Sequence, residues 1–272
     1  MASDSEPDVE IAFALKVYGC YTDLVSSTSA ELFFAPEPDL GGKLLYAGEL
    51  DDEGRALVVA SNIAGSASLC ASSDANLQKQ AVRDGVVDFL VTSLDEALRI
   101  LKNEIRKHET VAVCVSMPAD RLECEMLERG VLPDLLRPSE DSTAHDLAHR
   151  RHLARQSDRG PMAGTTLVVW SVAASPARWL PKLDEIAQGC LLPNAGPARR
   201  WLRLAPRYLG RMAKGIRLLV LDREFAASFV EQVRVRVEGG EIQAPVEIRT
   251  TFEGGNEEHH FAPTNSDETN PG

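Results

Sequence analysis

The segment with the clearest chemical implication is "KLLYAGELDDEG", residues 43–54, in which an apolar run ends at a glycine and carboxylates follow. In a nucleotide-binding α/β unit, this is where small residues let backbone N–H groups approach a pyrophosphate at the start of a helix. Gly48 and Gly54 are the glycines of this segment. Four side chains that carry the same charge as a phosphate stand between them: Glu49, Asp51, Asp52 and Glu53. Their charge and size disfavour phosphate binding here.

A second group that could do chemistry is a set of three histidines, His145, His149 and His152, at i, i+4 and i+7. On a helix they would share one face, which is acceptable geometry for imidazole ligands of a metal. Arg150 and Arg151 lie among them, and their charge opposes a cation. We therefore interpret the segment as a solvated basic helix and predict no metal site. The sequence supplies no convincing nucleophile or acid–base pair, so we assign no catalytic residue.

The composition predicts a soluble globular protein with a cytoplasmic location. The 272 residues are 44% hydrophobic, enough for one large or two modest domains with a core. No apolar run approaches the roughly 20 residues of a membrane helix, and the N-terminus is acidic where a signal peptide is basic. The net charge of −12 argues against nucleic-acid binding. Five cysteines without CxxC spacing are expected to be buried thiols rather than disulfides or a zinc site.

Alternating strand and helix patterns predict the fold. The apolar runs "KLLYA", "ASLCA", "VVDFLVT" and "TVAVCVS" are typical of buried parallel strands. Each is followed by a helical pattern, over residues 55–64, 74–83, 94–107 and 119–129. We predict an α/β protein with a Rossmann-like doubly wound, mainly parallel sheet and helices on both faces. The later apolar runs "LVVWSVA", "IRLLVL" and "PVEIRT" are expected to complete or extend the same sheet.

The domain organisation expected from these patterns is a single compact unit over residues 11–252. Its two halves, 11–136 and 166–252, are joined by a loop and helix at 137–165. Residues 1–10 and 253–272 are polar and rich in breakers, so we expect both ends to be disordered.

Taken in order, these segments resemble the urocanase (urocanate hydratase) family. The resemblance is to the family's NAD-binding Rossmann-like region, in a shortened and degenerate stand-alone form, over roughly residues 11–252. Among the pieces that carry it are "YGCYTDLVSSTSAELFF", "GGKLLYAG", "ALVVASNIAGSASL", "LERGVLPDLL", "STAHD" and "EGGEIQAPVEIR". Their colinear order, with "STAHD" and "GGEIQAPVEI", makes the case.

The resemblance implies NAD as the cofactor and urocanate hydratase, a lyase of histidine degradation, as the family activity. In the family the NAD acts as an electrophile and the protein orients it. The family's glycine loop corresponds to "GELDDEG", which makes Gly48 and Gly54 cofactor-binding candidates. The "STAHD" motif contacts NAD in the family and adds Ser142, Thr143 and His145 as candidates. The simpler interpretation is that Ser142 or Thr143 caps a helix.

Several positions depart from the family pattern. Ser72 stands where the family has an acid that holds a ribose hydroxyl, and Pro118 stands where it has an asparagine. The family's catalytic cysteine has no counterpart in "ARQSDRGPMAGTT", and Cys190 belongs to a different segment. These departures favour a pseudoenzyme that acts as a binding or interaction module, with a second copy of itself or a full-length urocanase as partner.

Two other functions stay open at this point. One is an NAD-dependent urocanate hydratase, or a component of it, with an altered cofactor site. The other is an enzyme with new chemistry in the same cleft. Bound cofactor separates the first alternative from the module, because only the hydratase requires NAD.

Overall fold

The computed structural model describes residues 6–27, 37–137, 151–152, 164–210, 212–213 and 215–263. The chain divides into two compact units, where the sequence patterns predict one. The first unit comprises Met1–Ser157 and Asn194–Met212, and the second comprises Asp158–Pro193 and Ala213–Gly272. In the described part of the chain, no helix combines the length and the apolar character needed to span a membrane.

The first unit contains a parallel sheet, as predicted. Its strands, in spatial order, are β3 (Phe89–Val91), β4 (Ala112–Val115), β2 (Ala67–Ala71), β1 (Leu44–Glu49), β5 (Leu135–Leu136) and β6 (Arg151–His152). Every neighbouring pair is parallel. Because the chain adds β2 on one side of β1 and β5 on the other, the sheet is doubly wound.

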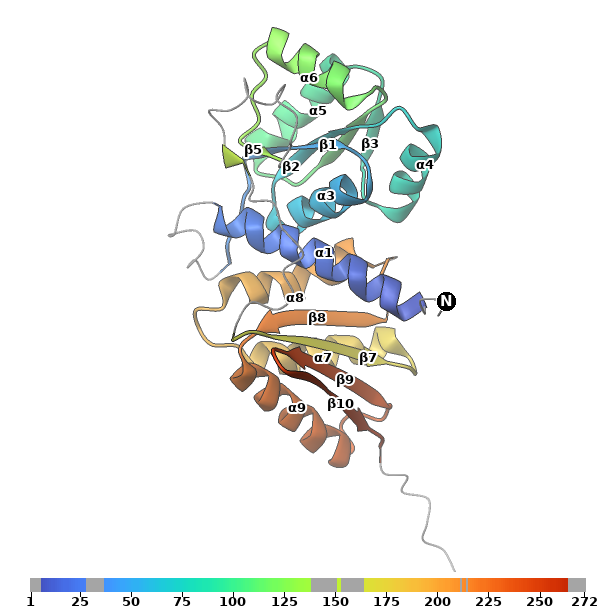
Figure 1. Ribbon diagram of the computed structural model, residues 1–272, viewed down its shortest axis with the longest axis vertical. Coiled ribbons are helices and arrows are strands. Elements are labelled where there is room, and N and C mark those ends of the chain that lie inside the picture. The colour runs from blue at the N-terminus through green and yellow to red at the C-terminus, as the bar shows by residue number, and fades with distance from the viewer. Residues whose placement is uncertain are drawn as a thin grey trace, which may run out of the picture. The chain divides into compact units, whose positions relative to one another are not determined.

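Helices cover both faces of this sheet (Figure 1). On one face lie α5 (Leu94–Lys107) and α6 (Ala119–Glu128), whose apolar side chains form one buried cluster with alternate strand residues. On the other face lies α3 (Asp52–Ala64), and α4 (Ala75–Asp84) packs against β3. Local signals set the helix ends: the Ser93 side chain caps α5, and His108 ends it in the left-handed conformation.

An N-terminal helix that the sequence patterns do not predict completes the first unit. Helix α1 (Glu6–Ser26) packs on α3, and α8 (Gly196–Tyr208) packs on α3 as well. Tyr18 meets Trp201 edge-on with ring centroids 4.8 Å apart, and the Tyr21 hydroxyl donates a hydrogen bond to the Pro197 carbonyl at 2.9 Å. The expectation of disorder over residues 1–10 is therefore wrong for residues 6–10, because apolar burial further along α1 supports the helix.

The second unit has its own antiparallel sheet, in the order β10 (Gly255–Phe261), β9 (Val246–Phe252), β7 (Thr166–Val172) and β8 (Ile216–Leu221). Helices α7 (Pro176–Cys190) and α9 (Arg223–Glu238) pack against each other and against β7. Trp170 and Phe229 meet in this core with ring centroids 4.9 Å apart.

Two expectations are corrected by the second unit. Its strands do not extend the parallel sheet, because β7 pairs antiparallel with both β8 and β9. Residues 255–261, which the sequence places in a disordered tail, pair with β9 along its whole length. The turn that joins these strands contains Gly254, whose φ of 114° is a conformation that favours glycine.

Candidate functional site

The candidate site is the switch point of the sheet, where the carboxyl ends of β1 and β5 lie side by side; we call it the crevice, after the place where such sheets bind ligands. Open α/β sheets bind their ligands at the point where the strand order reverses, and in this sheet the reversal falls at β1. The β1–α3 turn and Arg137, which directly follows β5, meet at this point. The sequence candidates flank this turn, with Gly48 near the end of β1 and Gly54 in the first turn of α3.

The two glycines are required by the backbone of the turn. Gly48 has a φ of +71° and lies where the β1–β2 register shifts. A Cβ at Gly48 would have room, so the left-handed conformation is what favours glycine there. Gly54 is different, because a Cβ at this position would overlap the carbonyl oxygen of Glu49. Both glycines therefore have structural roles that need no phosphate.

The N-terminus of α3 is already supplied with an anion by the chain itself. Asp51 is the N-cap residue, and its Oδ1 accepts a hydrogen bond of 2.8 Å from the Gly54 N–H. Asp52 and Glu53 occupy the first turn. Carboxylates at this end complement the helix dipole in the same way as a bound phosphate.

Arg137 completes the cluster from the neighbouring strand. Its Nη1 donates to Asp51 Oδ1 at 2.9 Å and to the Glu49 carbonyl at 3.1 Å. Its Nη2 donates to Asp51 Oδ2 at 3.0 Å and to Glu53 Oε2 at 2.6 Å. The arginine side chain is 19% exposed. We call Arg137, Asp51 and Glu53 the crevice cluster.

Charges within the crevice cluster stabilise one another. Partial burial opposes ionisation of Asp51, but the hydrogen bonds from Arg137 and the Gly54 N–H outweigh it and lower the pKa of the carboxyl. Burial also opposes the charge of Arg137, and the two carboxylates outweigh it and raise the pKa of the guanidinium. Asp51 and Arg137 are therefore both charged near neutral pH, and neither is poised to exchange a proton there.

At the neighbouring strand end, the described residues place Ser72 directly after β2, and the nearest acid, Asp74, caps α4. Ser72 is buried after β2, its Oγ accepts from the Asp74 N–H at 3.3 Å, and its carbonyl accepts from Gln78 Nε2 at 2.6 Å. Asp74 caps α4 through hydrogen bonds from the N–H groups of Asn76 and Leu77. Pro118 begins α6 without a side-chain cap. These residues serve the ends of helices.

The remaining sequence candidates, Ser142, Thr143 and His145, lie outside the described residues, as does His149. His152 belongs to strand β6 and not to a helix, so the predicted helical face of three histidines does not extend to it. The described residues contain no group of three or more His, Cys, Asp or Glu side chains arranged to hold a metal ion.

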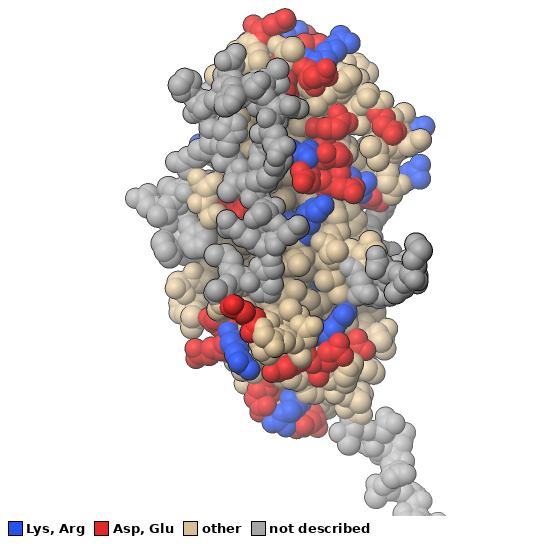
Figure 2. All heavy atoms as spheres, in the orientation of Figure 1, with Lys and Arg blue, Asp and Glu red and all other residues tan. Residues whose placement is uncertain are grey.

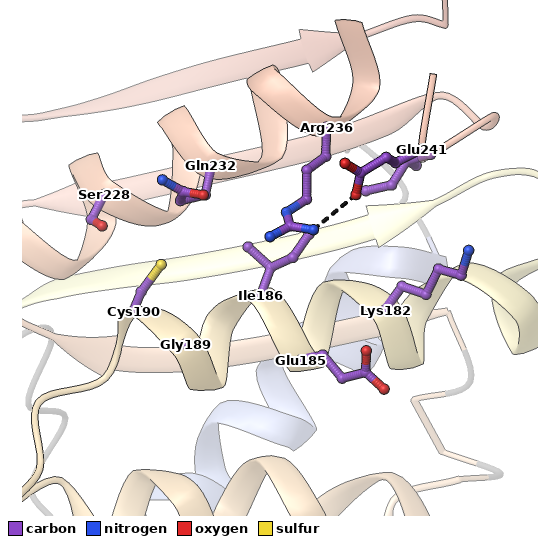
Figure 3. A pocket seen from close by; sticks show the side chains of 10 residues that line it. Lys182, Glu185, Ile186, Gly189, Cys190, Ser228, Gln232, Arg236 and Glu241 are labelled. Atoms are coloured by element: carbon purple, nitrogen blue, oxygen red, sulfur yellow. Dashed lines mark hydrogen bonds and ion pairs between the residues drawn. The ribbon is translucent and has the colours of Figure 1, made fainter. Parts of the chain in front are cut away.

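A second hollow lies between α7 and α9 in the second unit (Figure 3). Its volume is about 580 Å³, within the range of small-molecule sites. Lys182, Glu185 and Cys190 line it from α7, and Arg236 faces them from α9, paired with Glu241 at 2.8 Å. The lining has both charges in equal number and no nucleophile beside a base, so we assign it no reaction.

The sequence did not reveal two features of the structure, which are Arg137 at the candidate site and the hollow in the second unit. Arg137 follows a two-residue strand, and its partners lie more than eighty residues earlier in the chain. The only signal was a cation placed directly after an apolar run. The hollow between α7 and α9 had no signal, because its lining residues come from two helices and the segment after α9, which only the tertiary structure brings together.

Figure 2 shows how charged side chains are distributed on one face of the molecule. Acidic and basic side chains are interspersed over the described residues of that face. A protein that binds a phosphate backbone usually gathers its Lys and Arg into a stripe or patch.

The strand order and the glycine turn at the switch point define the class of protein: a Rossmann-like α/β fold, here with a crevice occupied by the chain's own charged side chains. A family model, described as the urocanase Rossmann-like domain, matches residues 17–153, which include all six strands of the parallel sheet. The chain belongs to the urocanase family.

Proposed function

We propose that this urocanase-family protein does not hold NAD in the manner of the family and acts as a binding or interaction module built on a Rossmann-like domain. The observation that carries the proposal is the crevice cluster. Its arginine bridges two carboxylates at the helix terminus where a dinucleotide pyrophosphate would be expected.

Charge and existing hydrogen bonds both oppose a pyrophosphate at this point. A pyrophosphate entering the crevice would approach Asp51 and Glu53, which repel it, and would have to compete for an arginine that already has two partners. The Asp51 carboxylate also takes the Gly54 N–H, the kind of backbone donor that a phosphate uses. The residues present therefore do not fit the pyrophosphate of NAD, and we route no reaction step through the cofactor.

The pKa shifts of the crevice cluster also argue against acid–base catalysis there. General acid–base catalysis works best with a group whose pKa lies near the working pH. The pKa of Asp51 is lowered and that of Arg137 is raised, so both move away from neutrality.

An NAD-dependent urocanate hydratase of histidine degradation, with an altered cofactor site, is the second candidate. The observation in its favour is the retained backbone of the turn, in which Gly48 keeps its positive φ and Gly54 its close approach to β1. That backbone is compatible with a dinucleotide loop once its side chains are removed.

The test combines mass spectrometry of the purified protein with thermal-shift titrations against NAD and urocanate. We expect no copurified nucleotide, no saturable rise in Tm with millimolar NAD, and no consumption of urocanate. A saturable rise with NAD, or NAD released on denaturation, contradicts the proposal and supports the hydratase.

A pair of matched variants tests the crevice cluster itself. Asp51→Ser with Glu53→Ser removes both carboxylates and keeps a residue able to cap α3. Asp95→Ser with Glu96→Ser removes two carboxylates from the first turn of α5, away from the crevice. If the crevice carboxylates repel dinucleotides, only the first double variant gains a Tm response to NAD. Equal responses, or none in either, contradict that role.

A further inference from the structure

The hollow between α7 and α9 has a charged end and an uncharged polar end. Figure 3 shows its charged side chains gathered toward one end and its uncharged polar side chains toward the other. The charged ones are Lys182, Glu185, Arg236 and Glu241, and the uncharged ones are Cys190, Ser228 and Gln232. Because both helices contribute to each end, a ligand that lies along the hollow contacts α7 and α9 together.

The hollow is built from one face of each helix. Its lining positions on α7 recur at intervals of three and four residues, and those on α9 recur every four residues. Such positions lie above one another on a helix. At Gly189 no other atom lies within 4 Å of an added Cβ, so the wall of α7 is open there.

Arg236 keeps the hydrogen-bond donors that a carboxylate requires. Its side chain extends from α9 toward α7 (Figure 3). Among the described residues its one hydrogen bond runs from Nη1 to Glu241 Oε2 at 2.8 Å, so donors remain on Nε and Nη2. A guanidinium presents such donors as a fork that matches the two oxygens of a carboxylate. Lys182 adds a second cation at this end.

The carboxylates at the same end oppose a simple anion. Glu241 is paired with Arg236, and Glu185 lines the hollow without an ion-pair partner in the described part of the chain. Two cations and two carboxylates have no net charge, so a phosphate dianion would meet repulsion as well as attraction. A ligand with an ammonium group beside its carboxylate complements both signs.

We propose that the hollow binds a free α-amino acid with an uncharged polar side chain. Such a molecule carries both charges at one end and its side chain at the other, as the two ends of the hollow do. Gln232 lies one helical turn, about 6 Å, from Arg236 along α9, a span that suits a side chain as long as that of glutamine. The Gln232 amide and the Ser228 hydroxyl can each donate and accept a hydrogen bond. The hollow lies within the second unit, so the inference does not depend on whether NAD binds.

The experiment is a titration of the full chain with L-glutamine, followed by proton–nitrogen correlation NMR. We expect saturable shifts of the Gln232 side-chain amide and the Arg236 Nε–H, with a dissociation constant of about 1 mM or below. Glutaramate, which is glutamine without its ammonium group, should bind about 10-fold more weakly, because it leaves the carboxylates of the hollow unmatched. L-glutamate should also bind about 10-fold more weakly, because it places a charge at the uncharged end.

Two variants and a matched control locate the site. Arg236→Gln should weaken glutamine binding about 10-fold or more, because it removes the donor fork. Gly189→Phe should abolish binding by filling the hollow, and circular dichroism should show the fold retained, because its Cβ meets no atom within 4 Å. Arg234→Gln makes the same change on α9 at a position that does not line the hollow, and it should bind as the wild type does.

Three results overturn the proposal. The first is the lack of a saturable shift with glutamine up to about 20 mM. The second is equal binding of glutaramate, which would reduce the hollow to a site for anions. The third is an Arg236→Gln variant that binds as tightly as the wild type; Arg236 is 43% exposed, so this variant tests the site even if Gly189→Phe does not fold.

Discussion

Two arginine–carboxylate pairs, one in each unit, contain carboxyl groups whose pKa values shift in opposite directions. In the first unit Asp51 lies 2.9 Å from Arg137, its side chain is 50% exposed, and its pKa is lowered. In the second unit Asp184 lies 3.1 Å from Arg217, its side chain is only 9% exposed, and burial raises its pKa to about 6. The arginine favours ionisation of its partner in both pairs, and the extent of desolvation decides whether the pKa of the carboxyl falls or rises overall.

The crevice cluster lies at the surface, whereas the Asp184–Arg217 pair is buried. In the crevice cluster water still reaches Asp51, so the hydrogen bonds from Arg137 lower the pKa of that carboxyl. In the second unit Arg217 and Trp170 both lower the pKa of Asp184, yet they do not offset the loss of water around it. We therefore expect the crevice cluster to tolerate substitution and the Asp184–Arg217 pair to be sensitive to it.

In the first unit, we expect the largest loss of stability from a substitution that disturbs the backbone between β1 and α3. Gly54→Ala places a methyl group on the Glu49 carbonyl, so the turn or the start of α3 has to move. We expect a loss of about 4 kcal/mol or more in the free energy of unfolding, measured by urea denaturation. Gly189→Ala on α7 is the control, since nothing lies within 4 Å of its added Cβ, and it should be neutral or slightly stabilising. Equal effects at the two sites would contradict the close packing at Gly54.

Arg217→Met should cost about 3 kcal/mol near neutral pH, because it leaves the buried Asp184 carboxylate without its partner. The cost should shrink in acid, where Asp184 becomes protonated and needs no cation. Urea denaturation at several pH values measures both effects. A cost below about 1 kcal/mol at neutral pH would show that Asp184 behaves like a surface carboxylate.

The pH dependence of Asp184 follows from the direction of its shift. The folded carboxyl binds its proton more tightly than the unfolded chain, so its contribution to stability is complete below pH 3.8 and is lost as pH rises to about 6. The change is at most about 3 kcal/mol. The difference between wild type and Asp184→Asn isolates it from other groups, and it should slope only within this window. A flat difference would refute the raised pKa.

Arg137→Gln should have the smallest effect, about 1 kcal/mol or less near neutral pH, since the carboxylates it releases are half exposed or more. The pKa of Asp51 should rise toward its ordinary value, so the cost should vanish as pH falls through the titration of that carboxyl. A double-mutant cycle with Asp51→Asn measures the coupling. A coupling above about 3 kcal/mol would place this cluster in the same class as the Asp184 pair.

Local patterns in the sequence were enough for most of the first unit. The helix predicted over residues 94–107 has those bounds in the structure, because its apolar spacing and its serine cap are both local signals. The four parallel strands were recognised as short apolar runs for the same reason. Helix α1 was missed because its apolar face is supported by Trp201 and α3, which are remote in sequence.

Non-local pairing explains the larger error in the second unit. The runs "LVVWSVA" and "IRLLVL" are equally compatible with parallel and antiparallel neighbours, since a buried strand is apolar in either case. In the candidate site, too, some residues follow from a local pattern and others depend on strand pairing. Gly48 and Gly54 were found from their place after an apolar run, whereas Arg137 becomes a partner of Asp51 only when β5 lies beside β1.

The sequence by itself determined that the β1–α3 turn carries acids in place of small residues, and that the first half of the chain winds into a parallel α/β sheet. Those properties follow from residue types and spacing within a few turns of chain. The tertiary structure alone decided which cation meets those acids, how deeply each ion pair is buried, and that a hollow is left between α7 and α9. These depend on contacts between segments far apart in sequence, where water is excluded or admitted by packing that no local pattern records.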